Sequence, residues 1–155
     1  IQGGSASNVI PSEVYLQGTI RSYEDTVREQ LWKEVEQAFA LSEAFGGSYR
    51  FQLQKGYPSA FNHAHVNDWM RTVVRDLDSA DNIVEADFGM GAEDFAYMMQ
   101  LAPGAMFMLG AATEDGVWRG HHTPVFDIDE RVMPFGAAIL AETARRYVTG
   151  KLAAS

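Results

Sequence analysis

The sequence contains no cysteine, no long apolar segment and few basic residues. Without cysteine there are neither disulfides nor thiolate ligands, so any bound metal ion must be held by His, Asp or Glu. No apolar run approaches the roughly 18–20 residues that are needed to span a bilayer. Because the absence of cysteine is compatible with a reducing compartment, we expect a cytoplasmic protein.

Basic residues are outnumbered by acidic ones: 12 Lys and Arg against 21 Asp and Glu give a formal net charge of −9. An acidic chain is repelled by phosphate backbones and by anionic lipid. We therefore expect neither nucleic acid nor a membrane surface as a partner. With 46% hydrophobic and 21% charged residues, the composition is that of an ordinary globular protein.

Several catalytic signatures are also missing. The sequence has no serine nucleophile elbow, no P-loop, no dinucleotide-binding glycine fingerprint and no HEXXH motif. It begins at Ile1 without a methionine, and residues 1–8 have neither the basic nor the apolar part of a signal peptide. This start is typical of the middle of a longer sequence, so we expect the chain to be a piece of a larger protein.

The first third of the chain has the pattern strand–helix–strand. Apolar and polar side chains alternate over 13–21 and again over 49–55, which predicts two half-buried strands. Between them, apolar residues at helical spacing predict an amphipathic helix over about 23–45. The expected N-cap is Ser22, and the expected stop is Gly46-Gly47.

The remainder alternates between helices and short apolar strands. A helix is expected from an N-cap at Asn62 to about Leu77, and a last helix over about 130–149. A short strand is expected near 83–84, and the apolar run 105–109 is typical of a strand that is covered on both faces. The remaining expectations are a short helix with Phe95, Met98 and Met99, a cap at Asp129, and an irregular helix start at Pro134.

The pattern changes near residue 57, which divides the chain into segments 1–57 and 58–155. Neither segment has enough elements to enclose a layer of helices and a sheet. We therefore predict the α/β class, with both domains incomplete.

The strongest chemical candidate is the segment Gly120-His121-His122-Thr123-Pro124. Adjacent side chains in extended backbone point in opposite directions, so at most one histidine enters a given site. His122, just ahead of the proline turn, is the better placed of the two, and imidazole is a common ligand of Zn²⁺ or Mn²⁺. From the residues alone, an ordinary loop histidine remains the alternative.

Two further candidates lie elsewhere in the chain. Gly89 and Gly91 precede a short helix, where exposed N–H groups suit an anion, although Glu93 and Asp94 could simply cap that helix. Arg21 ends the first predicted strand, where its guanidinium could hold a carboxylate, or simply be solvated. Asn8 follows the glycine pair at the start of the chain.

Three segments in order resemble the M20 family of metal-dependent amidohydrolases. GGSASNVIP followed by VYLQGTIRS is similar to the lid, or dimerisation, domain of that family. MGAEDFAYM followed by PGAMFMLG resembles its glutamate-aspartate-phenylalanine segment and the next strand. HHTPVFDIDE resembles the motif with the last metal-ligand histidine. The nearest resemblance is to the branch that hydrolyses N-acyl amino acids.

The resemblance implies a role for each candidate residue. His122 would bind one of two metal ions, Zn²⁺ or Mn²⁺. Asn8 and Arg21 would lie on the lid side of the cleft, near the substrate's carboxylate or scissile carbonyl, and Gly91 and Glu93 would line the pocket. Residues 1–57 would be the later part of a ferredoxin-like lid, and 58–155 the last part of a zinc-peptidase-like catalytic domain.

The resemblance also implies what this chain lacks. The other metal ligands and the general-base glutamate of the family would precede Ile1, so we expect the isolated chain to be inactive. We expect the parent protein to hydrolyse N-acyl amino acids or small peptides and to form a homodimer through its lid. The alternatives are a non-catalytic dimerisation or binding module, and a remnant that binds a small carboxylate ligand.

Overall fold

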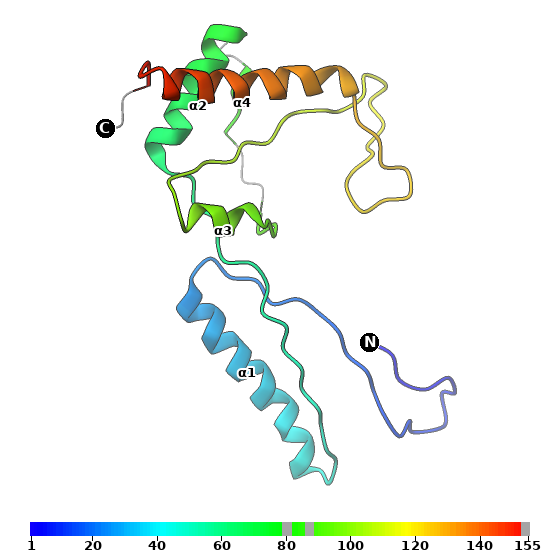
Figure 1. The fold of residues 1–155 in the computed structure, drawn as a ribbon. Coiled ribbons are helices and arrows are strands. Elements are labelled where there is room, and N and C mark those ends of the chain that lie inside the picture. Colours follow the sequence, from blue (N-terminus) through cyan, green and yellow to red (C-terminus); the bar gives the residue numbers. More distant parts are fainter. Residues whose placement is uncertain (79–81, 86–88, 153–155) are drawn as a thin grey trace. The chain divides into compact units, whose positions relative to one another are not determined.

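The computed structural model describes residues 1–78, 82–85 and 89–152. Contacts divide the chain into two units: residues 1–59 together with 89–92, and residues 60–88 together with 93–155. Among the described residues, no helix combines the length and the apolar character that crossing a membrane requires. The helices of the two units are drawn in Figure 1.

The first unit is organised around α1, which spans Asp25–Ala44 and confirms the helix expected over about 23–45. Its N-cap is Glu24 and not Ser22, because the Ser22 hydroxyl donates to the Glu24 carbonyl instead of accepting from the first turn. The helix ends as expected, since Gly46 takes the left-handed conformation with φ +79°.

The segment 49–57 runs along α1 (Figure 1). The rings of Phe39 and Phe51 are 6.1 Å apart, and the Lys55 ammonium lies 5.2 Å from the ring of Trp32. A cation over an indole face is attracted by the ring's negative face. The described residues nevertheless bury no side chain of α1, so its apolar positions are only partly covered.

The predicted strands do not form a sheet among the described residues. The pairing found there outside helices is one isolated antiparallel bridge, in which Gln2 and Tyr15 exchange two backbone hydrogen bonds of 2.8 Å. A strand exists only if a neighbouring strand accepts its hydrogen bonds. The alternation of apolar and polar side chains indicates extended backbone only. The described residues provide no neighbouring strand for these segments. The predicted α/β class is therefore not confirmed for the segments expected as strands: 13–21, 49–55, 83–84 and 105–109.

The second unit contains the buried core. Helix α2, Ala64–Leu77, crosses helix α4, Met133–Val148 (Figure 1). Val73 of α2 and Ile139 of α4 are the largest fully buried side chains, at 0% and 2% exposed. The other buried residues among those described belong to the same unit: Val66, Ala96, Met99, Ala105, Gly136, Thr143 and Leu152.

Among the described residues, the apolar segment after residue 103 is held by Asn62, just before α2, and by α4. Asn62 does not cap α2, whose N-cap is His63. Its side-chain amide donates to the Met106 carbonyl and its carbonyl oxygen accepts from the Met106 N–H, both at 2.8 Å. This imitates the pairing that a neighbouring strand would supply. On α4, a Cβ added at Gly136 would lie 2.8 Å from Leu109 Cδ2, so Leu109 packs closely against the backbone of Gly136.

The remaining predicted helices are confirmed with small shifts. Helix α3 spans Phe95–Met99, as expected. Before α4, the 3-10 helix η2 spans Glu130–Val132, and the Asp129 carboxylate accepts the Arg131 N–H as its cap. The irregular start that was expected near Pro134 is confirmed by η2, the 3-10 turn directly before α4. Pro134 itself falls in the first turn of α4, where no backbone donor is lost.

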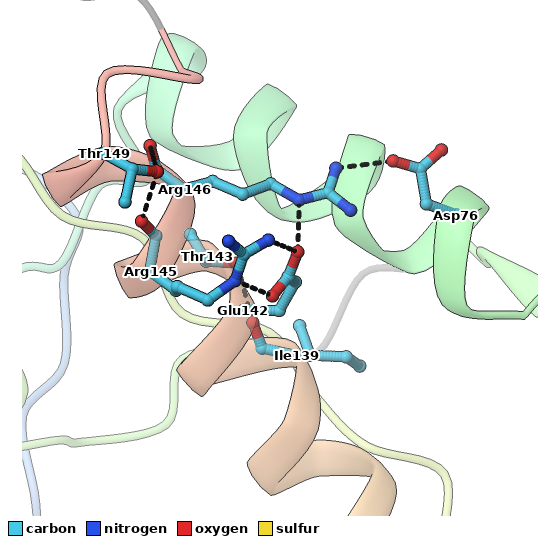
Figure 2. A network of polar contacts seen from close by, with 7 residues as sticks. All are labelled: Asp76, Ile139, Glu142, Thr143, Arg145, Arg146 and Thr149. Atoms are coloured by element: carbon cyan, nitrogen blue, oxygen red, sulfur yellow. Dashed lines mark hydrogen bonds and ion pairs between the residues drawn. The ribbon is translucent and has the colours of Figure 1, made fainter.

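A polar network joins α4 to α2 (Figure 2). Glu142 accepts two hydrogen bonds of 2.6 Å from Arg145 and one of 2.7 Å from Arg146. Arg146 also donates to Asp76 near the end of α2. The hydrogen bonds from Arg145 and then Arg146 lower the pKa of Glu142 from 4.5 to about 2. The charged form of Glu142 is therefore the one that the fold favours.

We predict that Glu142 contributes to stability in a pH-dependent way. A carboxyl group whose folded pKa is depressed stabilises the fold fully above its unfolded pKa and loses that contribution as the pH falls through the folded value. With the pKa lowered from 4.5 to about 2, the loss falls between these two pH values. Glu142→Gln should therefore be less stable at neutral pH and flatten the dependence of unfolding free energy on pH in that window.

Urea denaturation followed by circular dichroism, repeated from neutral pH down to the folded pKa of Glu142, measures this effect. The exposed Glu130, just before α4, provides the matched control as Glu130→Gln, which should keep the wild-type pH profile. An unchanged profile in Glu142→Gln would show that the network does not hold the carboxylate in its charged form.

Candidate functional site

The histidine motif lies in the loop 110–131, drawn in yellow to orange before α4 in Figure 1. Near its start the loop is closed by Arg119, whose guanidinium donates to both carboxylate oxygens of Asp115 at 2.8 and 2.6 Å. Arg119 also donates to the Thr113 hydroxyl at 2.6 Å. The hydrogen bond from Arg119 is the main cause that holds the pKa of Asp115 well below its ordinary value. The two-oxygen contact makes this a directional ion pair.

A second ion-pair cluster closes the other end of the loop. Arg131 donates to Asp129 through Nε at 2.8 Å and to Glu114 through Nη2 at 2.6 Å. The Asp129 N–H donates to the Ala111 carbonyl at 2.9 Å. Residues at the beginning and at the end of the loop are thus joined directly, and the intervening chain is constrained at both ends.

His121 and His122 lie in a turn between these two clusters. The Thr123 hydroxyl donates to the Gly120 carbonyl at 2.8 Å and closes the turn. His122 has φ +63°, a left-handed conformation that is uncommon for residues other than glycine. Both histidine side chains are exposed, and the His121 ring lies 5.4 Å from that of Phe126. Such strained conformations occur preferentially at functional sites, which favours His122 as the residue that is presented for binding.

The donor set of the described residues does not make a complete metal site. Among residues 1–78, 82–85 and 89–152, no three His, Asp or Glu side chains gather closely enough to hold an ion. An exposed imidazole fits one position of a zinc or manganese site, and a closed site needs three or four ligands. The role of His122 as a ligand stays a prediction, and we derive no catalytic step through a metal ion from this geometry.

The predicted substrate-binding residues fall into two groups. In the first unit, Arg21 Nη1 donates to the Met90 carbonyl at 2.8 Å, so Arg21 lies beside the segment that contains Gly91. Only one of the five guanidinium N–H groups makes this bond, which leaves donors for another acceptor. Asn8 is an exposed residue of the same unit. Its position near Arg21 in a cleft stays a prediction.

Glu93 belongs to the second unit and lies just before α3. The capping role that sequence reasoning allowed for Glu93 and Asp94 is not supported, because the described residues provide no side-chain cap for α3. The Glu93 side chain is exposed. Its place in a substrate pocket stays a prediction.

Sequence reasoning missed the cluster of Thr113, Asp115 and Arg119. The signal was present, since Asp115 and Arg119 are four residues apart and Thr113 lies two residues before the aspartate. Short polar residues at that spacing favour turns that their own side chains close. The cluster has no place in a catalytic motif, and its importance is visible only from its position beside the histidine turn.

Comparison with known proteins decides the family. Residues 3–146 match the family described as Peptidase family M20/M25/M40. The chain belongs to this family. The predicted resemblance to M20 amidohydrolases is thereby confirmed, and the match includes all three motifs on which the resemblance was based.

Individual M20 relatives align over nearly the whole chain. The putative amidohydrolase YhaA of Bacillus subtilis (strain 168) is 35% identical over 90% of this chain and 36% of its own length. IAA-amino acid hydrolase ILR1-like 2 of Arabidopsis thaliana is 34% identical over 97% of this chain and 35% of its own length. Thermostable carboxypeptidase 1 of Saccharolobus solfataricus is 31% identical over 95% of this chain and 37% of its own length. The chain therefore spans little more than a third of the length of these M20 relatives.

We predict that the pair of Asp115 and Arg119 keeps the histidine turn in place. Asp115→Asn removes the charge and one of the two strong acceptors, so the loop should open more often. Hydrogen–deuterium exchange measured by mass spectrometry should show faster exchange in peptides that cover 113–126, with unchanged exchange in α2 and α4. The exposed Glu130 again offers a control, and Glu130→Gln should exchange as the wild type does. Equal exchange in Asp115→Asn and wild type would contradict this role.

Proposed function

We propose that this chain is the C-terminal portion of a metal-dependent amidohydrolase that cleaves the amide bond of N-acyl amino acids or small peptides. The observation that carries the proposal is the exposed His122, held in a left-handed turn within the motif HHTPVFDIDE. The names of two relatives, an IAA-amino acid hydrolase and a carboxypeptidase, support this substrate class. Membership of the M20 family supports the reaction type.

In this proposal His122 supplies one ligand to a site for Zn²⁺ or Mn²⁺. The ions bound in such sites polarise a carbonyl and lower the pKa of a bound water. The remaining ligands and the general-base glutamate belong to other parts of the complete protein. The two ion-pair clusters of the loop 110–131 constrain the chain on either side of His122, which supports binding without a large rearrangement of the loop.

Arg21 is proposed to bind the free carboxylate of the substrate. Its bond to the Met90 carbonyl orients the guanidinium and leaves further donors for a two-oxygen contact. Gly91 and Glu93 are proposed to line the pocket, and Asn8 to lie near the carboxylate or the scissile carbonyl. We further propose that residues 1–57 form part of a lid through which two copies pair. The uncovered side chains of α1 support a partner for this unit.

We predict that His122→Ala lowers kcat/KM of the full-length enzyme by more than about 100-fold, because removing a direct ligand should exceed the roughly 10–100-fold effects of residues behind the ligands. Hydrolysis of N-acetyl and N-benzoyl amino acids, followed by the release of the free amino acid, measures this. His121→Ala is the matched control, since His121 contacts Phe126 and should matter far less. Normal turnover by His122→Ala would end the ligand assignment.

The isolated 155-residue chain should neither hydrolyse these substrates nor bind metal tightly. One histidine cannot supply the affinity of a closed site, which depends on several ligands acting together. Titration calorimetry with Zn²⁺ should show weak binding that decreases in the His122→Ala form of the chain. Stoichiometric Zn²⁺ that survives dialysis would contradict the proposal that the other ligands lie outside this chain.

A further inference from the structure

Asp115 is followed directly by Gly116, and the two residues lie in an open turn of the histidine loop. Gly116 takes the left-handed conformation with φ +71°, and a Cβ added there would meet none of the described atoms within 4 Å. The Asp115 side chain is 49% exposed. Where an unhindered glycine follows an aspartate, the glycine nitrogen can attack the aspartate's own carboxyl group. This dipeptide therefore has a reactivity that the proposed function does not use.

The reaction is an isomerisation that needs no reactant besides water. The Gly116 nitrogen forms a bond to the Asp115 carboxyl carbon, and the carboxyl hydroxyl leaves as water with the amide hydrogen, which gives a cyclic succinimide. Water then opens the ring at one of its two carbonyls. Opening at the former side-chain carbonyl restores aspartate. Opening at the main-chain carbonyl gives isoaspartate, in which the main chain runs through the former side chain and is longer by one methylene.

The contacts of the Asp115 carboxylate oppose the first step. Its Oδ1 accepts from the Thr113 hydroxyl at 2.8 Å, from the Val117 N–H at 3.1 Å and from Arg119 Nη1 at 2.8 Å. Its Oδ2 accepts from Arg119 Nη2 at 2.6 Å. The ring can close only if the carboxyl group leaves these donors and turns toward the Gly116 nitrogen. It must also be protonated, because an ionised carboxylate has no hydroxyl to release, and hydrogen bonds to the charged form oppose protonation.

We propose that Asp115–Gly116 is a latent site of isoaspartate formation and that Arg119 suppresses the reaction by holding the carboxylate. The product could not keep the same contact, because its carboxylate is attached directly to Cα and its main chain is longer. Since the pair of Asp115 and Arg119 closes the turn before the two histidines, isomerisation would open the segment that leads to His122. The inference concerns the chemistry of the loop and does not rest on the proposed function.

Incubating the protein in mildly acidic buffer at physiological temperature tests this protection. Chymotryptic peptides that contain Asp115 are separated by liquid chromatography, and electron-transfer fragmentation distinguishes isoaspartate from aspartate at equal mass. A synthetic peptide of residues 109–121 has the same sequence without the fold and serves as the reference. We expect isoaspartate to accumulate more slowly in the folded protein than in this peptide.

Substitutions identify the group that protects. Arg119→Gln removes the charge and the two-oxygen contact, and should raise the rate of isoaspartate formation about two- to fivefold, the factor to which an exposed ion pair corresponds. Thr113→Val removes one neutral donor and retains Arg119, so it should give a smaller increase. Arg71→Gln is the matched control, because it removes an exposed ion pair with Glu85 outside the loop and should keep the wild-type rate.

The order peptide, then Arg119→Gln, then wild type, from fastest to slowest, supports the proposal. Equal rates in Arg119→Gln and wild type would show that Arg119 does not protect the site. Equal rates in wild type and peptide would show that the carboxylate is not held in solution. Either result overturns the proposal and leaves the proposed function untouched, since no activity is measured. If circular dichroism shows that Arg119→Gln does not fold, the comparison passes to Thr113→Val, and a wild-type rate in that variant overturns the proposal.

Discussion

Ile139 and Val73 are buried where α4 crosses α2, and their burial holds the two helices against each other. Removing each of these side chains from water contributes roughly 1.5–3 kcal/mol, which exceeds what a single exposed ion pair supplies. The network of Glu142, Arg146 and Asp76 fixes how the two helices are oriented, since it links the C-terminal part of α4 to that of α2. Because η2 leads directly into α4, the end of the histidine loop is positioned by this crossing.

The loop 110–131 shows how a chain with little regular structure can still present a side chain accurately. Arg131 joins the two ends of the loop through Glu114 and Asp129. Nearer its start, Arg119 and Asp115 form a second ion pair, which closes a short turn. Exposed ion pairs of this kind contribute little to global stability. Their effect is local, because each removes conformations in which the turn at His122 would be open. The left-handed φ of His122 occurs within this constrained segment.

Helices were predicted well and strands were not, for a physical reason. The limits of α1 and of α4 follow from residues within one or two turns, such as Gly46 and Pro134, which act on the backbone directly. The exact caps depended on competing bonds. Ser22 donates to Glu24, which is local, whereas Asn62 pairs with Met106, which is 44 residues away along the chain. Strand partners are non-local, so alternation over 13–21 could indicate extended backbone and nothing about pairing. The contact of Arg21 with Met90 spans 69 residues and was likewise invisible in any local pattern.

The sequence by itself determined the family, the positions of the helices and the identity of the candidate residues, because contiguous motifs and helical spacing are local properties of the chain. Only the tertiary structure decided that Arg21 lies beside the segment of Gly91 and that Asn62 holds the backbone of Met106. These relations arise from side chains brought together by folding. No spacing rule along the chain encodes them.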